Sequence, residues 1–491
     1  LTSLDLSNFN TQNVKNMSHM FHELDKLTSL DISHFTTDNV LDMSYMFSGC
    51  SLLQTLNITN FHTEKVKDMS YMFDSLINVE ELNISNFDTK NVENMLSMFQ
   101  NCKNIKKLEL SGFNTENVKD MAYMFQSITF LTSLDLSNFR TNKVTDMIGM
   151  FNGLPRITSL DLSKFNTSNV KDMSLMFKDC ISLESLDLSS FDTSKVTDMY
   201  SMFSRCLKLT KLDLGNFNTK NVEDMSGMFE SCESLTSLDI SHFTTSGVKN
   251  MGSMFASLAN LNKLDVSQFD TKYVKNISKM FYQCKQITSL NVSNFNTKEV
   301  TDMSELFSEC QSLTSLSLKN FDTSQVTDMA KMFNGCSSLT YLDISSFITN
   351  EVRSFSHMFY NCKLLKEIDV SKFETSQLTE MGSMFSGCEA LVSLDLKNFD
   401  VSQVISMQYL FNNCKSLTDL DISHFKNDKV QYMTKCFQGL KSLKKLDLGN
   451  IDTSLVTDMS GLFSGCSSLT NINLSNLKTN KVFTMQYMFQ D

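Results

Sequence analysis

Residues 313–338 read LTSLSLKNFDTSQVTDMAKMFNGCSS, and this 26-residue unit recurs in one unbroken register from Leu1 to Asp491. There are eighteen full copies and a nineteenth, of 23 residues, that begins at Leu469. All 32 methionines fall at positions 17 and 20 of the unit, and position 21 is Phe in every copy. So strict a period predicts a solenoid, in which each unit buries its apolar face against its neighbours. We therefore expect residues 1–491 to form one continuous array without a separate domain.

Two apolar patterns within the unit predict two kinds of secondary structure. Positions 4 and 6 are apolar and alternate with polar positions 3, 5 and 7, as in the segment Leu134-Asp135-Leu136-Ser137, which indicates a half-buried strand. Positions 17, 20, 21 and 24 have the spacing of one helical face, and the usual Asp or Asn at position 16 suits a helix start. We expect an α/β repeat solenoid in which stacked short strands form one parallel sheet and each coil carries a short helix.

The charge and hydropathy of the chain exclude two classes of partner. The net charge is −12 and is spread along the repeats, so the basic stripe that nucleic-acid binding needs is missing. No apolar run approaches the ~20 residues that span a bilayer, so we expect no membrane insertion by this segment. The copies at both ends lack polar caps, and we expect the caps, a signal peptide and an anchor to lie outside this sequence.

The consensus L-x-x-L-x-L-x-x-F-x-T-x-x-V-x-x-M-x-x-M-F-x-x-C carries a family resemblance over the whole chain. It resembles the 26-residue repeat of bacterial surface lipoproteins of mollicutes, Listeria and lactobacilli, within the BspA-like class of leucine-rich repeats. The resemblance implies a leucine-rich-repeat-like solenoid on a cell surface, with a role in adhesion or host interaction and no catalytic residues. The copies that begin at Leu391 and Leu417 depart from it, because Val401 and Asn427 replace the threonine of position 11. We expect local irregularity there.

Twelve of the thirteen cysteines occupy position 24, where six other copies have Leu or Ile. A position that accepts Cys or Leu is typical of an apolar packing site, so we expect buried free thiols. A disulfide ladder and a metal site are the alternatives. No Ser/His/Asp constellation or phosphate loop can be assembled, so we expect neither a catalytic site nor a cofactor.

Position 5 is Asp in thirteen of the nineteen copies and should point outward between two buried leucines. Carboxylates ~5 Å apart repel by roughly 0.8 kcal/mol per neighbour even in water. Solvation and hydrogen bonds to nearby Ser or backbone groups are one way to offset this repulsion. The alternative is binding of a divalent cation or a basic ligand along a concave face, for which the candidates are Asp135, Asp161, Asp187, Asp213, Asp239 and Asp265.

The sequence predicts a non-enzymatic cell-surface protein that is a platform for adhesion or protein interaction. Its partner would be a protein or glycan on a host cell or matrix, read by outward residues at positions 2, 3, 5, 7 and 8. The residue type at position 3 varies from copy to copy, which favours a surface that recognises a partner. The candidate contact residues at this position are Lys107, Lys211, Lys263, Tyr341, Glu367, Asp419 and Lys445. The alternative is a structural protein whose copies bind one another in an extracellular fibre or surface layer.

Overall fold

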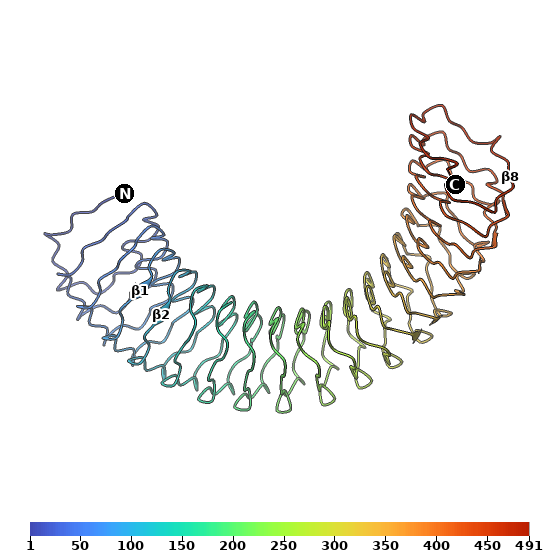
Figure 1. Ribbon diagram of the computed structural model, residues 1–491. Helices are drawn as coiled ribbons and strands as arrows, with labels where there is room; N and C mark the ends of the chain where they lie inside the picture. Colours follow the sequence, from blue (N-terminus) through green and yellow to red (C-terminus); the bar gives the residue numbers. More distant parts are fainter. Residues whose placement is uncertain (491) are drawn as a thin grey trace. The chain divides into compact units, whose positions relative to one another are not determined.

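The computed structural model describes residues 1–490, whose 26-residue copies form stacked coils within each of two parts of the chain (Figure 1). The coils belong to two compact units, Leu1–Phe243 and Thr244–Asp491. The boundary between the units falls after position 9 of the tenth copy, inside the repeat rather than between two copies. One continuous array stays a prediction.

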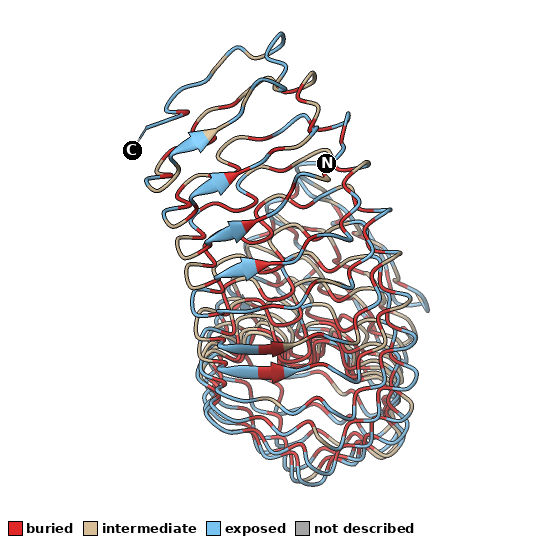
Figure 2. Ribbon diagram, turned by 90° about the vertical axis from the view of Figure 1, so that its right-hand side faces the viewer, coloured by how far each residue is buried: buried red, intermediate tan, exposed pale blue. Residues whose placement is uncertain are grey.

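The strands are short, parallel and registered at the period of the repeat. The described residues contain four two-stranded sheets, and every paired residue faces the residue 26 positions later. Unit 1 holds β1 (Glu81–Leu82) and β2 (Lys107–Leu108). Unit 2 holds β3 (Ser315–Ser317), β4 (Tyr341–Asp343), β5 (Ser393–Leu394), β6 (Asp419–Leu420), β7 (Lys445–Leu446) and β8 (Asn471–Ile472). The predicted solenoid of short strands is confirmed. Exposed and buried residues alternate along β3, and most arrows in Figure 2 pass from exposed to buried.

The expectation of one parallel sheet is wrong, because the strands of the described residues pair only in twos, in four separate sheets. The backbone amide of Gln54, at position 2, lies 3.5 Å from the carbonyl oxygen of Thr28, the position-2 residue of the preceding coil. From Thr210 to Glu184 the distance is again 3.5 Å. Bonds of this length are at the limit of hydrogen-bond geometry. Strand pairing is therefore limited to the coils that approach more closely.

The tightest contact between coils runs instead along positions 16–23. Here the amides of positions 17, 19, 21 and 23 donate to the carbonyls of positions 16, 18, 20 and 22 in the next coil. In the first coil the donors Met17, His19, Phe21 and Glu23 reach Asp42, Ser44, Met46 and Ser48 at 2.7–3.0 Å. Position-16 residues of neighbouring coils also form parallel bridges, such as Asn16↔Asp42 in unit 1 and Asn250↔Asn276 in unit 2. We call this set of inter-coil bonds the turn ladder.

The expected helix at positions 17–24 is wrong, and the described residues contain no helix. Position 19 has a positive φ in all nineteen copies, and position 23 has one in all eighteen copies where it is described. A left-handed residue every fourth position interrupts an α-helix, and the turn ladder takes the amides that helical bonds would need. Turns of this kind bury positions 17, 20, 21 and 24 just as a helix would. Glycine at position 23 in six copies is a sequence signal of this left-handed backbone that the apolar spacing does not show. These glycines are Gly49, Gly153, Gly335, Gly387, Gly439 and Gly465.

The core consists of the apolar positions that the sequence predicts, each stacked on its counterpart in the next coil. Positions 1, 4, 6, 9, 14, 17, 20, 21 and 24 are buried in nearly every coil away from the ends. Within each unit, neighbouring Phe rings of position 21 stack with centroids 5.6–6.0 Å apart and within 15° of parallel. Such pairs add about 0.5–1.5 kcal/mol each beyond their area burial. No helix among the described residues has the length and apolarity needed to cross a membrane.

Candidate interaction surfaces

The first candidate surface is the strand face, formed by the outward side chains of positions 3 and 5. The seven position-3 candidates are all exposed, and each precedes a buried leucine or isoleucine at position 4. Their outward placement is confirmed, whereas their contact with a ligand stays a prediction. Lys107 and Lys211 of unit 1 lie four coils apart, so the structure does not bring them together as a cluster. Asp419 and Lys445 lie in neighbouring coils.

Two details of the strand face bear on recognition. Lys107 Nζ contacts Glu109 Oε1 at 2.6 Å, and this hydrogen bond raises the pKa of Lys107. Tyr341 is 57% exposed and stands beside a hollow of about 260 Å³. Small residues at positions 3 and 5 of the two preceding coils, such as Ser289 and Ser315, leave this space open. An exposed tyrosine beside a hollow is typical of a protein-binding contact.

The aspartates of position 5 each close a local turn. Asp135 Oδ1 accepts the backbone N–H of Ser137 at 2.9 Å, and the same bond recurs at 2.9–3.0 Å in the other five candidates: Asp161, Asp187, Asp213, Asp239 and Asp265. This backbone hydrogen bond lowers the pKa of Asp135. Across residues 1–490, no group of three His, Cys, Asp or Glu side chains could hold a metal ion. The carboxylates therefore act in turns, and cation binding by this column gains no support from the geometry.

The strand face is also the more widely spaced side of each unit. Its position-2 inter-coil hydrogen bonds measure 2.9–3.5 Å, whereas those of the turn ladder measure 2.6–3.3 Å. Binding along a concave face lined by position 5 stays a prediction.

The cysteines are packing residues. All thirteen are free and buried, and each of the twelve at position 24 donates its S–H to the position-21 carbonyl of the preceding coil at 3.0–3.2 Å. Burial raises the pKa of Cys50 to about 11 and that of Cys180 to about 12. A thiol with so high a pKa is a poor nucleophile and a poor metal ligand.

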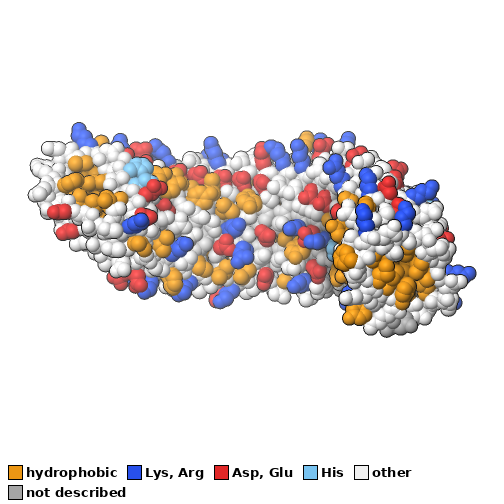
Figure 3. All heavy atoms as spheres, turned by 90° about the horizontal axis from the view of Figure 1, so that it is seen from above, with side chains coloured by type: hydrophobic (Ala, Val, Ile, Leu, Met, Phe, Trp, Pro, Cys, Tyr) orange, Lys and Arg blue, Asp and Glu red, His pale blue; other side chains and the backbone are white. Residues whose placement is uncertain are grey.

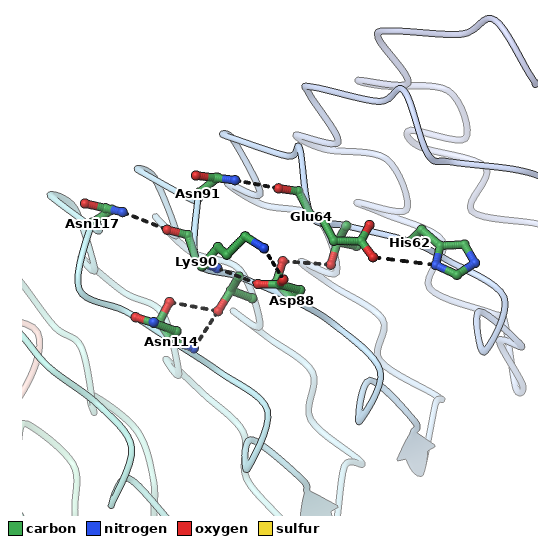
Figure 4. Close-up of polar contacts among 9 residues, drawn as sticks. His62, Glu64, Asp88, Lys90, Asn91, Asn114 and Asn117 are labelled. Atoms are coloured by element: carbon green, nitrogen blue, oxygen red, sulfur yellow. Dashed lines mark hydrogen bonds and ion pairs between the residues drawn. The ribbon is translucent and has the colours of Figure 1, made fainter.

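The second candidate surface, which the sequence analysis did not single out, is the turn edge at positions 10–15. Figure 4 shows it in unit 1. The buried hydroxyl of Thr89 donates to the carbonyl of Asn114 at 2.9 Å and accepts the amide of Asn114 at 2.8 Å. The same pair of bonds recurs in other coils, as from Thr141 to both backbone groups of Asn166 at position 10 of the next coil. We call these repeated bonds the threonine ladder.

Many outward side chains of the turn edge in unit 1 form hydrogen bonds to the backbone or to side chains of neighbouring coils. Asn91 Nδ2 donates to the Glu64 carbonyl at 2.6 Å, and Asn117 Nδ2 donates to the Lys90 carbonyl at 2.7 Å (Figure 4). Lys90 in turn pairs with Asp88 at 3.0 Å. Lysines that replace Asn at position 13 bond to the Asn of the preceding coil, namely Lys65 to Asn39, Lys143 to Asn117 and Lys195 to Asn169.

In unit 2 the turn edge contains a hollow of about 890 Å³ across the tenth to twelfth copies. Gly247 stands there at position 13, followed by Tyr273 in the next coil. The lysines that line this hollow are Lys249, Lys272, Lys275 and Lys298. Two sequence signals could have revealed it: the only glycine at position 13, and lysines at positions 12 and 15 of consecutive copies.

The expected irregularity appears in the copy that begins at Leu417. Other copies close a turn from the position-14 amide to the position-11 carbonyl, as from Val404 to Val401 at 3.0 Å. Asn427 instead turns its side-chain amide to the Val404 carbonyl at 2.7 Å, and the local turn is replaced by a bend. Val401, in the preceding copy that begins at Leu391, has no hydroxyl, so the threonine ladder is interrupted between these two copies.

Comparisons with known proteins cover the chain almost completely. A family model described as "Mycoplasma protein of unknown function, DUF285" matches residues 2–79, 53–153, 129–212, 208–290, 284–394 and 383–491. No curated protein matches the sequence.

Solved structures with a similar repeat include two bacterial proteins. A leucine-rich repeat protein from Bacteroides ovatus ATCC 8483 is 17% identical, with 89% of this chain and 82% of that chain covered and a TM-score of 0.30. A leucine-rich cell surface protein from Faecalibacterium prausnitzii A2-165 is 19% identical, with 68% and 84% covered and a TM-score of 0.35.

Proposed function

The chain belongs to the DUF285 family, and from this premise we propose that it is a non-enzymatic repeat scaffold of the cell surface that binds a partner through its outward columns. The family match confirms the resemblance to the BspA-like 26-residue repeats. Adhesion to a host cell or matrix is the specific form of binding that we propose. The buried positions of the repeat form a constant scaffold, and the exposed positions that vary between copies recognise the partner.

One observation carries the proposal: position 3 changes chemistry from coil to coil while position 4, next to it, stays a buried leucine or isoleucine. Lys107, Tyr341 and Glu367 occupy equivalent places in the repeat, yet they present a cation, an aromatic ring and an anion. A purely structural repeat needs no such variation at an exposed position. On the face of the molecule drawn in Figure 3, cationic, anionic and hydrophobic side chains are interspersed.

The partner that this surface suits is a protein or a glycan. Tyrosine is enriched among residues that dominate binding energy, and Tyr341 combines exposure with a hollow at its side. Exposed charges such as Lys211 and Lys263 would mainly set the association rate and the choice of partner. Nothing in this proposal requires a cofactor.

The non-enzymatic part of the proposal rests on the state of the reactive side chains. The thiols are buried with raised pKa values, and the regularly placed carboxylates accept backbone hydrogen bonds in turns. Each coil repeats the same surface, whereas catalysis requires different groups converging on one place.

Adherence of coated beads tests the proposal. Fluorescent beads carrying the purified chain should bind an epithelial monolayer or purified basement-membrane matrix, and the soluble chain should compete with them. Adherence no greater than that of albumin-coated beads on both surfaces would overturn the proposal.

Self-assembly into a fibre or surface layer is the alternative function. Sedimentation velocity of the purified chain separates the two functions. Discrete monomers are expected for a binding scaffold, whereas concentration-dependent filaments would favour the structural protein.

A further inference from the structure

The hollow on the turn edge of unit 2 differs in charge from the protein as a whole. Four lysines line it, from positions 12 and 15 of three consecutive copies, while Glu299 is the one carboxylate residue in its lining. All four lysines are exposed. The chain as a whole carries a net charge of −12, so this local excess of positive charge is opposite in sign to the overall charge. Such a local excess attracts anions to one place on the surface.

Two lysines at the same repeat positions of unit 1 form ion pairs. Lys90, at position 12, contacts Asp88 at 3.0 Å, and Lys119, at position 15, contacts Glu93 at 2.6 Å. Among the described residues, Lys272, Lys275 and Lys298 form no ion pair. The ammonium groups of Lys272, Lys275 and Lys298 are therefore available to an external anion, which those of Lys90 and Lys119 are not.

The shape of the hollow comes from Gly247 and Tyr273. Position 13 elsewhere carries a longer side chain, often an Asn bonded to the preceding coil, and Gly247 leaves that space open. Tyr273 is 52% exposed, and Lys272 Nζ lies 5.0 Å from its ring centroid. The hollow thus combines a row of cations with one partly exposed aromatic ring, which can pack against the apolar face of a sugar.

We propose that this hollow binds a short segment of a sulfated glycan chain. Sulfate groups on successive sugars supply the anions for the lysine row, and a sugar ring covers Tyr273. The four cations are all Lys, whereas Arg is the usual choice for two-point recognition of phosphate in nucleic acids. One aromatic residue also does not make the stacking platform that binds successive bases. This site lies on the turn edge, apart from the strand face of the proposed function.

Binding of a heparin-derived hexasaccharide to the full chain tests the proposal. Isothermal titration at roughly physiological salt should show binding by the wild type and much weaker binding of the desulfated hexasaccharide. The combined variant Lys249→Gln, Lys272→Gln, Lys275→Gln and Lys298→Gln should bind the sulfated sugar at least about tenfold more weakly, as expected for the loss of several exposed charge pairs. Tyr273→Ala should weaken binding without changing its dependence on salt.

A matched variant removes the same number of charges from the same repeat positions of unit 1: Lys90→Gln, Lys119→Gln, Lys171→Gln and Lys220→Gln. It should bind the sulfated sugar as the wild type does, with an unchanged circular dichroism spectrum in both variants. If both variants lost the same amount of affinity for the sulfated sugar, the loss would come from the change in overall charge, and the proposed site would be overturned. Absence of wild-type binding would overturn it as well. Single-stranded DNA or anionic lipid vesicles that bind the hollow as tightly as the hexasaccharide would overturn the assignment to a glycan.

Discussion

At the scale of the residue, the unusual feature is the number of non-glycine residues whose backbone lies in the left-handed region. Twenty-eight described residues other than glycine have a positive φ between 50° and 63°, all at positions 19 and 23. Each such residue costs roughly 1 kcal/mol relative to ordinary backbone. The cost is tolerated because these residues donate their amides to the next coil, as Ser253 does to Ser278 at 2.8 Å.

Replacing a left-handed residue by glycine should therefore stabilise the protein. For Ser253→Gly, at φ 56°, we expect a gain of about 0.5–1 kcal/mol in the free energy of unfolding. Ala256→Gly, three residues later and outside the left-handed region, should instead lose about 0.4–1 kcal/mol, because glycine makes the unfolded chain more flexible. Guanidinium unfolding measures both. Two losses of equal size would contradict the strain assigned to position 19.

The half-buried aspartates of position 16 supply a second test at this scale. Burial raises the pKa of Asp146, and Asp120 and Asp172 in the neighbouring coils raise it further. A carboxyl group whose folded pKa exceeds its ordinary value of 3.8 destabilises the fold when ionised, and this effect disappears as the pH falls through the raised pKa. Asp146→Asn keeps the acceptor for the Ile148 amide and should add a few tenths of a kcal/mol at neutral pH. Melting temperatures at neutral pH and near pH 3.5 should show this gap closing, and a gap that widened on acidification would contradict the sign.

At the scale of the element, each coil is held by backbone bonds to its neighbours rather than by bonds within a helix or a sheet. The alternation around Leu134 and Leu136 correctly predicted which side chains point inward. The helix at positions 17–24 could not be rejected from apolar spacing alone, because helical and turn backbones bury the same four positions. Only the glycines at position 23 and the shortness of the segment argued against it. The extent of strand pairing depends on coil spacing, which no single copy of the repeat specifies.

The threonine ladder gives the test of this inter-coil bonding. The Thr323 hydroxyl is buried, donates to the Ile348 carbonyl at 2.7 Å and accepts the Ile348 amide at 2.8 Å. Thr323→Val should lower the free energy of unfolding by about 1–3 kcal/mol, because two backbone groups lose their partner. Thr323→Ser keeps the hydroxyl and should recover most of this loss. Hydrogen exchange at Ile348 should accelerate in the Val variant alone, and unchanged exchange there would contradict the ladder.

At the scale of the whole molecule, nineteen nearly identical coils give a scaffold on which function depends on the few columns that vary. The sequence predicted the outward placement of Lys107, Lys211, Lys263 and Lys445, because alternation about a buried leucine is a local property. It did not predict the hollow of the turn edge. That hollow depends on a side chain that Gly247 lacks and on how three successive coils lie against one another.

The most direct test of the account is bead adherence after charge reversal at position 3. The variant Lys107→Glu, Lys211→Glu, Lys263→Glu and Lys445→Glu changes only the strand face. Its matched control reverses four exposed lysines at positions 25 and 26, namely Lys103→Glu, Lys208→Glu, Lys363→Glu and Lys441→Glu. On epithelial monolayers, beads carrying the position-3 variant should lose at least about tenfold in adherence, while beads carrying the control should match the wild type. Equal adherence of all three would contradict recognition by the strand face.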